Sequence, residues 1–336
     1  MKISQPLIQN PPIKSLNHHA MFLGVLLLNP TYQNYFSSHY VNLYYDFNFK
    51  LANFISPRFY TEEEFFISTD IGYDVPDIIS EGYFFELICH MMNEGYYLYG
   101  NINERYIPNR SAYQKHDLTH NILFYGLETS LRVFDSIAYR NETDSSFDYR
   151  SEELDYDDFV TSIKNTHKES YIHFSKNYLH FFKNKPDYDF QFDANLLLRQ
   201  LCDYVDAQNI AFATQCSPNR VYGMAVYDAI INSFKSSEKI DLRATKLLLE
   251  HKQCMLQRIE YLVSSRIIST KDDLLDYEKI VQVFNKIHLL AIKYHLTQSQ
   301  AVKELIYKEI EQAIAVEKEI LQKLIIALSS TNGVLH

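Results

Sequence analysis

Hydrophobic and polar residues follow two different patterns along the chain, and the change falls near residue 190. Before this point, short apolar runs are separated by turns, which is typical of short helices mixed with strands. After it, apolar residues recur every three or four positions over long stretches, which predicts amphipathic helices. The pattern therefore predicts an α+β fold in two parts, a mixed lobe over residues 1–190 and a helical portion over 191–336.

The helical portion is expected to contain five helices. They cover residues 193–207, 221–234, 241–263, 271–295 and 298–328. Asp193 can cap the first of them with its side-chain oxygen. The last helix has an apolar face with Glu and Lys opposite, which either packs on the rest of the chain or forms a homodimer contact. This face consists of Leu305, Ile306, Ile310, Ile314, Ile320, Leu321, Leu324 and Leu328.

The mixed lobe is expected to combine two helices with several strands. The helices are predicted over 18–28 and 79–93, and the strands over 41–49, 64–68, 121–126 and 131–134. The strand over 64–68 is expected at a sheet edge, and the last two are expected to pair. The acidic segment 142–158 has little periodicity and is interpreted as a surface loop. The aromatic-rich stretch 32–66 is interpreted as a core of half-buried strands, with a substrate groove as the alternative.

Composition narrows the classes of partner. The chain carries 32 Lys and Arg against 42 Asp and Glu, a net charge of −10, whereas binding to nucleic acid requires clustered cations. Gly is rare, at 8 residues, and no G-x-G-x-x-G or G-x-x-x-x-G-K-[ST] string supports nucleotide binding. The apolar stretch over 22–28 is too short to span a bilayer, and no export signal is visible. We expect a cytoplasmic protein that binds neither nucleic acid nor membrane.

The cysteines and histidines form no metal-binding pattern. The four cysteines lie far apart without a C-x-x-C pair, which predicts reduced, structural thiols. They are Cys89, Cys202, Cys216 and Cys254. The adjacent His18 and His19 would project about 100° apart on a helix, so they cannot bind one ion as an i, i+4 pair does. We expect neither a metal nor another cofactor.

One predicted hairpin carries residues with catalytic chemistry. His120 begins its first strand, Asp135 ends its second strand, and residues 127–130 form the turn. In register around a four-residue loop, His120 lies opposite Asp135, with Cβ atoms about 4.5–5.5 Å apart. The carboxylate would then fix the tautomer of the imidazole, whose other nitrogen could act as a general base. A purely structural hydrogen bond between the two is the alternative.

Six short segments give the chain a resemblance to a known family. They are HHAMFLGVLL (18–27), RYIP (105–108), HNILFYGLE (120–128), RVFD (132–135), YGMAVYDAI (222–230) and DLRATKLLLEHKQCMLQRIEYL (241–262). The chain resembles papain-like cysteine enzymes of the double-glycine leader peptidase type. More specifically, it resembles proteins related to the N-terminal domain of butirosin biosynthesis protein H, which are found with antibiotic assembly genes.

The resemblance implies both a fold and an activity. The fold is that of papain-like cysteine proteases with an additional helical C-terminal portion. The activity is transfer of an acyl group from the thioester of an acyl or peptidyl carrier protein to a small-molecule amine. The resemblance matches His120 to the base of the family and Asp135 to the acid that orients it.

The chain departs from the family at the nucleophile. The family pattern has a Cys at the start of the first helix, about three residues before a small residue, for which Ala20 fits. Asn17 then occupies the nucleophile position, or His18 if the match is displaced by one residue. A carboxamide cannot attack a carbonyl carbon as a thiolate does. His18 and the neighbouring His19 are expected to contact the substrate.

Three functions are compatible with this sequence. In a noncovalent acyltransferase, His120 would deprotonate the amine while Asn17 polarises the carbonyl. A binding or accessory protein would keep the fold and the groove without turnover. The third alternative is a Cys acyltransferase or amide synthase whose nucleophile has been replaced. The three differ at residue 17.

Overall fold

The structure is a computed structural model that describes residues 2–55, 65–72, 74–136, 149–166, 178–237, 239–268 and 272–332. The chain forms two compact units, of which unit 1 comprises residues 1–30 and 58–188 and unit 2 comprises 31–57 and 189–336. The sequence-based division near residue 190 falls where the chain enters unit 2 for the second time. It does not anticipate that 31–57 belongs to unit 2, because the strand partner of this segment lies more than 160 residues away.

Unit 1 is built on an antiparallel sheet. Its strands pair in the order β4-β9-β5-β6-β7-β8, and β1 pairs with the end of β6 on the edge opposite β7. The bounds are β1 (Ile3–Ser4), β4 (Phe66–Gly72), β5 (Tyr97–Asn103), β6 (Thr119–Leu127), β7 (Leu131–Ser136), β8 (Tyr149–Leu154) and β9 (Tyr178–Asn184). The predicted edge strand over 64–68 corresponds to β4, which does lie at an edge. With its antiparallel sheets and its helices, the chain is α+β, as predicted.

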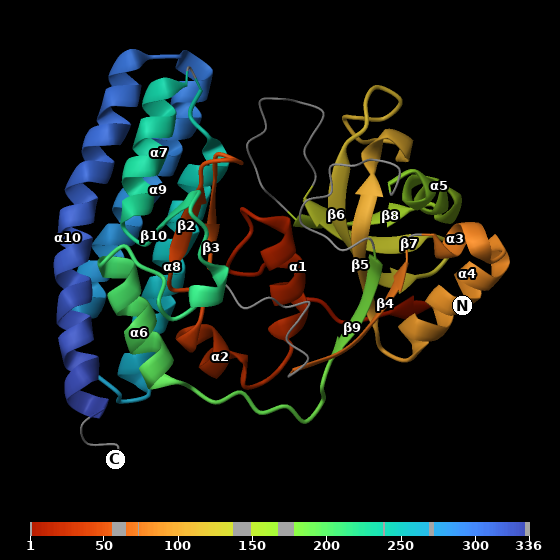
Figure 1. Cartoon of the computed structure of the whole chain (residues 1–336), viewed down its shortest axis with the longest axis horizontal. Coiled ribbons are helices and arrows are strands. Elements are labelled where there is room, and N and C mark those ends of the chain that lie inside the picture. The colour runs from red at the N-terminus through yellow and green to blue at the C-terminus, as the bar shows by residue number, and fades with distance from the viewer. Residues whose placement is uncertain are drawn as a thin grey trace. The chain divides into compact units, whose positions relative to one another are not determined.

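Helices cover both faces of this sheet (Figure 1). On one face lies α1 (Asn17–Leu26), whose Phe22 ring packs 4.9 Å from Tyr99 and 4.8 Å from Phe182. On the other face lie α4 (Glu81–Asn93) and α5 (Tyr156–Thr166), with the short α3 (Val75–Ile78) beside them. Because α1 is apolar on nearly all sides, its burial fixes the position of its first turn relative to the strands.

The predicted hairpin is present, with a different register. Strands β6 and β7 are adjacent and antiparallel, as predicted, and Leu123 lies opposite Phe134. The expected register instead paired Tyr125 with Ser130 and His120 with Asp135, and it is wrong by two residues. A bulge between Phe124 and Gly126 takes up an extra residue, which shortens the turn. The shift is two before the bulge, which keeps those side chains on their expected face, and three beyond it, where Gly126 pairs with Arg132.

Two segments differ from their predicted structure. Of the acidic segment 142–158, residues 142–148 lie outside the described part of the chain, but 149–154 form edge strand β8 and α5 begins at Tyr156. Charged side chains are compatible with an edge strand because one side of it faces water. In the aromatic stretch, residues 32–38 form helix α2 (Tyr32–Ser38) rather than a strand. Tyr35 and Phe36 bury one side of that helix.

Unit 2 combines a helical bundle with a small sheet. The bounds of its helices are α2, α6 (Ala194–Val205), α7 (Ala225–Ser236), α8 (Leu242–Ser264), α9 (Asp272–Thr297) and α10 (Gln300–Asn332). Helix α9 packs against both α8 and α10, and Asp193 caps α6 by accepting from the backbone N–H of Leu196 at 2.8 Å, as predicted. Strands β10 (Arg220–Tyr222), β2 (Leu43–Asp46) and β3 (Leu51–Phe54) pair in that order.

The helix predicted over 221–234 begins four residues later than expected, because the chain first forms β10. Gly223 separates the two elements with a positive φ of 55°. A Cβ at this position would lie 2.2 Å from the Tyr204 carbonyl oxygen, so only glycine fits. The two short 3₁₀ helices are η1 (Glu104–Tyr106) in unit 1 and η2 (Ala213–Gln215) in unit 2.

The apolar face of α10 packs inside unit 2. Ile306, Ile310, Ile320, Leu321, Leu324 and Leu328 are all buried there. The structure therefore shows this face packed on the rest of the chain, which was one of the two predicted alternatives. The homodimer contact stays a prediction. Within the described residues, no helix has the length and apolar character needed to cross a membrane.

Segment 31–57 is fixed to the bundle by a buried arginine. The Arg258 guanidinium of α8 donates to the carbonyl oxygens of Ser37 at 2.8 Å and Phe36 at 3.2 Å, and also to that of His39. These carbonyls lie at the C-terminal end of α2, where the last carbonyls of a helix lack their usual partners and only that of Phe36 accepts from the His39 N–H. Arg258 therefore acts as a long-range helix cap.

Candidate functional site

Three residues predicted from the sequence meet in unit 1. Asn17 is the first residue of α1, and its carboxamide Nδ2 contacts Nε2 of His120. His120 lies near the start of β6, and its other ring nitrogen, Nδ1, lies 3.5 Å from Oδ1 of Asp135 on β7. The His120 side chain is 24% exposed, whereas Asp135 is fully buried. The site can therefore be reached from solvent on its histidine side.

His120 and Asp135 meet although they are not directly opposed. Extension of the observed register places Asp135 opposite Ile122, two residues from His120 on the same face. Such diagonal neighbours are about 7–8 Å apart at their backbones, within reach of long side chains. The error in the predicted register therefore left the predicted contact intact.

Two further residues complete the site, and the sequence analysis missed both. Glu104, in η1 directly after β5, places Oε1 3.0 Å from His120 Nδ1, closer than the Asp135 oxygen. Arg110 contacts Oδ2 of Asp135 at 2.9 Å and Oε2 of Glu152 at 3.3 Å. Both come from the connection between β5 and β6, so one segment supplies a second carboxylate and a counter-charge. The RYIP segment (105–108), which is part of the family resemblance, lies between Glu104 and Arg110. It is the sequence feature that could have drawn attention to these two residues.

Opposing effects act on the pKa of His120. Burial lowers this pKa, because the charged ring loses hydration, but the carboxylates of Asp135 and Glu104 raise it more, to about 10. The imidazole is therefore protonated at neutral pH, and both of its nitrogens are donors. A protonated Nε2 requires an acceptor, which the Asn17 carboxamide can supply only with its oxygen turned to the place where Nδ2 now lies. The ring is an acid and a hydrogen-bond donor at neutral pH, and it becomes a base only in the alkaline range.

Several polar atoms of this cluster are buried with no well-aligned hydrogen bond among the described residues. They are His120 Nδ1, both carboxylate oxygens of Asp135, and Nη1 of Arg110. The contacts among them are ion pairs, whose attraction does not require hydrogen-bond alignment. Most buried polar atoms in native proteins have a hydrogen-bond partner, and exceptions concentrate at functional sites.

Among the described residues, three members of this cluster form a group that could hold a metal ion. Glu104, His120 and Asp135 offer ligand atoms within 4.8 Å of one another. The Arg110 guanidinium already contacts Asp135, however, so a cation at this position would lie next to a positive charge. The arrangement fits an orienting role for the carboxylates better than metal coordination.

A cavity lies next to the cluster. It has a volume of about 390 Å³ and is lined by Arg110, Ser111, Tyr113 and Lys115. Arg110 therefore connects the buried carboxylates to this opening. Its three other side chains, those of Ser111, Tyr113 and Lys115, also carry donor groups.

The remaining candidate residues lie elsewhere or are buried. His19 is buried, and burial lowers the pKa of the neighbouring His18 to about 4, so the His18 ring is neutral at neutral pH. Their predicted role in substrate binding stays a prediction. Of the cysteines, burial raises the pKa of Cys89, Cys202 and, to about 12, Cys254, which disfavours the reactive thiolate. Cys216 is exposed, with its Sγ 3.4 Å from the Asn209 carbonyl oxygen.

No protein-family model matches the chain, and no curated protein is significantly similar to it. Function must therefore be inferred from the residues of the site.

Proposed function

We propose that the chain is a papain-like acyltransferase of natural-product biosynthesis that works without a covalent intermediate. It would move an acyl group from the thioester of a carrier protein to the nitrogen of a small-molecule amine. The observation that carries this proposal is the contact between Asn17, at the start of α1, and Nε2 of His120, whose Nδ1 faces two carboxylates. In papain-like enzymes the corresponding contact is that of the nucleophile with its histidine.

The order of elements supports the papain-like part of the proposal. A buried helix comes first, and its N-terminal residue faces a histidine on an antiparallel strand. The acid follows on the neighbouring strand β7. Glu104 and Arg110 are additions to this pattern: Glu104, with Asp135, favours the protonated form of His120, and Arg110 pairs with Asp135.

The chemistry proceeds without a protein nucleophile because a thioester is already activated. The amine nitrogen attacks the carbonyl carbon, while His120 Nε2–H and the Asn17 carboxamide bind the developing oxyanion. The C–S bond then breaks, His120 gives its Nε2 proton to the leaving sulfur, and the ammonium nitrogen of the acceptor returns a proton to the ring. The products are an amide and the carrier thiol. The expected base role of His120 is thus replaced, at neutral pH, by that of an acid.

A binding or accessory protein is the second candidate. The observation that favours it is the direct contact of Asn17 with His120, which fills the place where a nucleophile would act. Such a protein would bind the acylated carrier and release it unchanged. The third candidate, a Cys enzyme whose nucleophile has been replaced, predicts that a thiol at position 17 restores covalent chemistry.

One experiment separates the three. The protein is incubated with an acylated carrier protein and an amine, and amide and acyl-protein adducts are measured by mass spectrometry for the unchanged chain and for Asn17→Cys. Amide formed by the unchanged chain without an adduct supports the noncovalent transferase. An adduct only in Asn17→Cys supports the replaced nucleophile, and carrier binding without product in either form supports the accessory protein. An adduct on Cys89, Cys202, Cys216 or Cys254 would refute the placement of the site.

The thiol pKa of the Asn17→Cys variant gives an independent check. A thiolate next to a protonated His120 is stabilised, so this pKa is expected well below the ordinary value of about 8.5. Alkylation by iodoacetamide as a function of pH measures it, in a background with the four native cysteines changed to Ser. In the matched variant Asn17→Cys/His120→Ala, the pKa should return to the ordinary range.

A further inference from the structure

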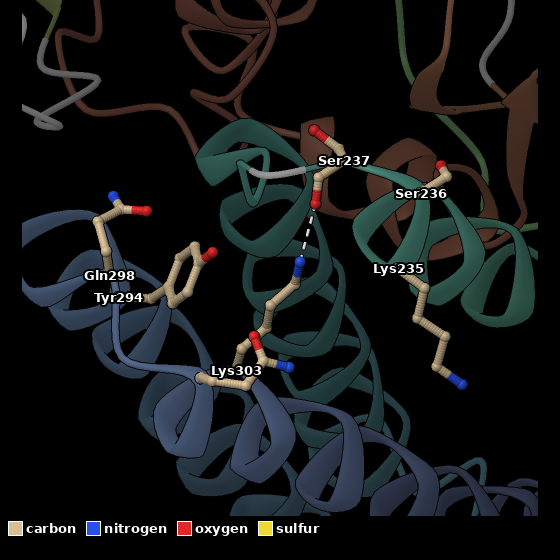
Figure 2. Close-up of a pocket in the computed structure, with 7 residues that line it drawn as sticks. Lys235, Ser236, Ser237, Tyr294, Gln298 and Lys303 are labelled. Carbon is tan, nitrogen blue, oxygen red and sulfur yellow. Dashed lines mark hydrogen bonds between the residues drawn. The ribbon is translucent and has the colours of Figure 1, made fainter.

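We propose that unit 2 contains a binding site for the phosphate group of a small molecule, independent of the site in unit 1. The site is a cavity of about 450 Å³ between the end of α7 and the turn that joins α9 to α10. It is lined by Lys235, Ser236, Ser237, Tyr294, Gln298, Gln300 and Lys303. Figure 2 shows Lys303 rising from α10 toward Ser237, with Tyr294 on one side and Lys235 on the other.

The charge of this cavity is opposite to that of the chain. Among the described residues, the lining contains two lysines and no carboxylate, although acidic residues outnumber basic ones by ten in the sequence. Glu304 is a described acidic neighbour, and it accepts a hydrogen bond from Gln300 Nε2 at 2.7 Å. A cavity that gathers cations in an acidic protein favours an anionic ligand.

The two lysines differ in their surroundings. Lys303 is only 7% exposed, and its Nζ donates to the Ser237 carbonyl oxygen at 2.8 Å while lying 5.7 Å from the centre of the Tyr294 ring. This contact holds the ammonium at the cavity and uses one of its three donors. Lys235, at the end of α7, is exposed, with its Nζ 5.4 Å from the centre of the Tyr307 ring. One cation is therefore fixed in place and the other can adjust to a ligand.

The remaining lining favours a phosphate over a carboxylate. Neutral donors accompany the two ammonium groups. The Ser237 hydroxyl accepts from the Lys239 N–H and can donate its own hydrogen, and the Gln298 and Gln300 amides each use one N–H within the chain and have a second to donate. A phosphate monoester presents three strong acceptor oxygens to such a set. The cavity volume lies within the range of small-molecule sites, so it also has room for an organic group attached to the phosphate.

Isothermal titration with inorganic phosphate tests the proposal at constant ionic strength. We expect saturable binding with one site, weakened at least tenfold in Lys235→Glu. Lys318→Glu, which makes the same charge change on the exposed side of α10, should bind phosphate like the unchanged chain. Acetate at the same concentration should compete poorly, whereas phenyl phosphate should bind more tightly than inorganic phosphate.

Several results would overturn this assignment. Binding that fails to saturate, or that Lys235→Glu and Lys318→Glu weaken equally, would show attraction by net charge alone. Acetate that competes as well as phosphate would show a site for carboxylates. Because Lys235 is exposed, its substitution leaves the packing of unit 2 intact, and a circular dichroism spectrum equal to that of the unchanged chain checks this.

Discussion

Two buried ionic clusters, one in each unit, differ in how completely their polar atoms are paired. In unit 2, Lys252 Nζ donates to Glu317 Oε1 at 2.6 Å and to the Tyr204 hydroxyl at 2.9 Å, and contacts His251 Nδ1 at 2.9 Å. Tyr227 and Tyr277 donate to the two oxygens of the same Glu317 carboxylate, at 2.6 and 2.7 Å. Every donor of the ammonium has an acceptor, and the carboxylate is fully surrounded. We call these residues around Lys252 and Glu317 the closed cluster, because the ammonium and the carboxylate have all their polar atoms paired.

In the cluster of unit 1, by contrast, some buried polar atoms have no aligned hydrogen bond, and we call it the open cluster. His120 Nδ1 and the oxygens of Asp135 form ion pairs without aligned hydrogen bonds, and His120 is partly exposed. A complete buried network rigidifies a core, whereas an incomplete one holds its charges ready for another group. The difference indicates a structural role for the Lys252 cluster, and it is compatible with the function proposed for the His120 cluster.

The largest expected effect comes from opening the closed cluster. Lys252→Met leaves the Glu317 carboxylate buried without its cation, which should lower the free energy of unfolding by about 3–5 kcal/mol. The double variant Lys252→Met/Glu317→Leu should recover most of that loss, because it removes both charges. Amide hydrogen exchange in α8 and α10 reports the stability of this unit separately. A single variant that costs less than about 1 kcal/mol would contradict the structural role.

The second prediction concerns the open cluster. If the chain transfers acyl groups, His120→Ala should lower the rate at least about a hundredfold, equivalent to about 2.7 kcal/mol in activation free energy. Its stability should change less than that of Lys252→Met. Replacement of all four cysteines by Ser serves as the control, and the rate should then stay within a few-fold. Equal rates for His120→Ala and the unchanged chain would remove His120 from the mechanism.

A third prediction uses the pH dependence of the open cluster. The folded pKa of His120, about 10, lies above its ordinary value of 6.5, so its protonation stabilises unit 1 fully below about pH 6.5. This stabilisation is lost as the pH rises through about 10. Glu104→Gln removes one of the two carboxylates, which should lower the pKa of His120 and reduce the alkaline loss of stability. Nitrogen-15 NMR of the imidazole measures the pKa, and an ordinary value in the unchanged chain would contradict the proposed charge arrangement.

The pH response of the closed cluster should have the opposite sign. Burial lowers the pKa of Lys252 to about 8 despite its contact with Glu317, so the unfolded chain binds more protons between about pH 8 and 10.5. This lysine therefore contributes a gain in stability with rising pH over a range in which His120 contributes a loss. Hydrogen exchange resolved by unit distinguishes the two trends.

The smallest effect is expected at an exposed ion pair. Lys286 Nζ contacts Glu309 Oε1 at 2.8 Å between α9 and α10, and the lysine side chain is 54% exposed. Because water screens such a pair, Lys286→Ala should cost about 0.2–1 kcal/mol. Thermal unfolding of this variant beside Lys252→Met compares two Lys–Glu contacts of similar length. Equal losses would show that burial does not determine their importance.

The fold was predictable where local pattern decides it. The apolar periodicity located α8, α9 and α10, and the apolar, aromatic and β-branched runs 121–126 and 131–134 located the hairpin. The bulge between Phe124 and Gly126 was not visible in that pattern, because its cause is the pairing with neighbouring strands. Helix α2 was missed because an aromatic composition favours strands, and its buried residues, Tyr35 to Ser38, are consecutive and show no helical spacing.

The candidate site was predictable only in part. His120 and Asp135 are close in the hairpin, and Asn17 came from the family resemblance, whereas Glu104 and Arg110 lie on a connection whose path depends on the whole sheet. The sequence analysis overlooked one feature that indicates the closed cluster, which is the position of Lys252 in α8. Lys252 follows Leu248 by four residues and precedes Met255 and Ile259 on the apolar face of α8, where a charge requires a buried partner.

The split composition of unit 2 has a consequence for synthesis of the protein. Residues 31–57 leave the ribosome early, but β10 and Arg258, which complete their sheet and cap α2, follow more than 160 residues later. At roughly 5–20 residues per second, β2 and β3 wait for about 10 s or longer with an unpaired strand edge. During that interval the nascent chain is a target for chaperones and for other strands. Expression of residues 189–336 alone would leave β10 without its neighbour, however long the fragment were given to fold.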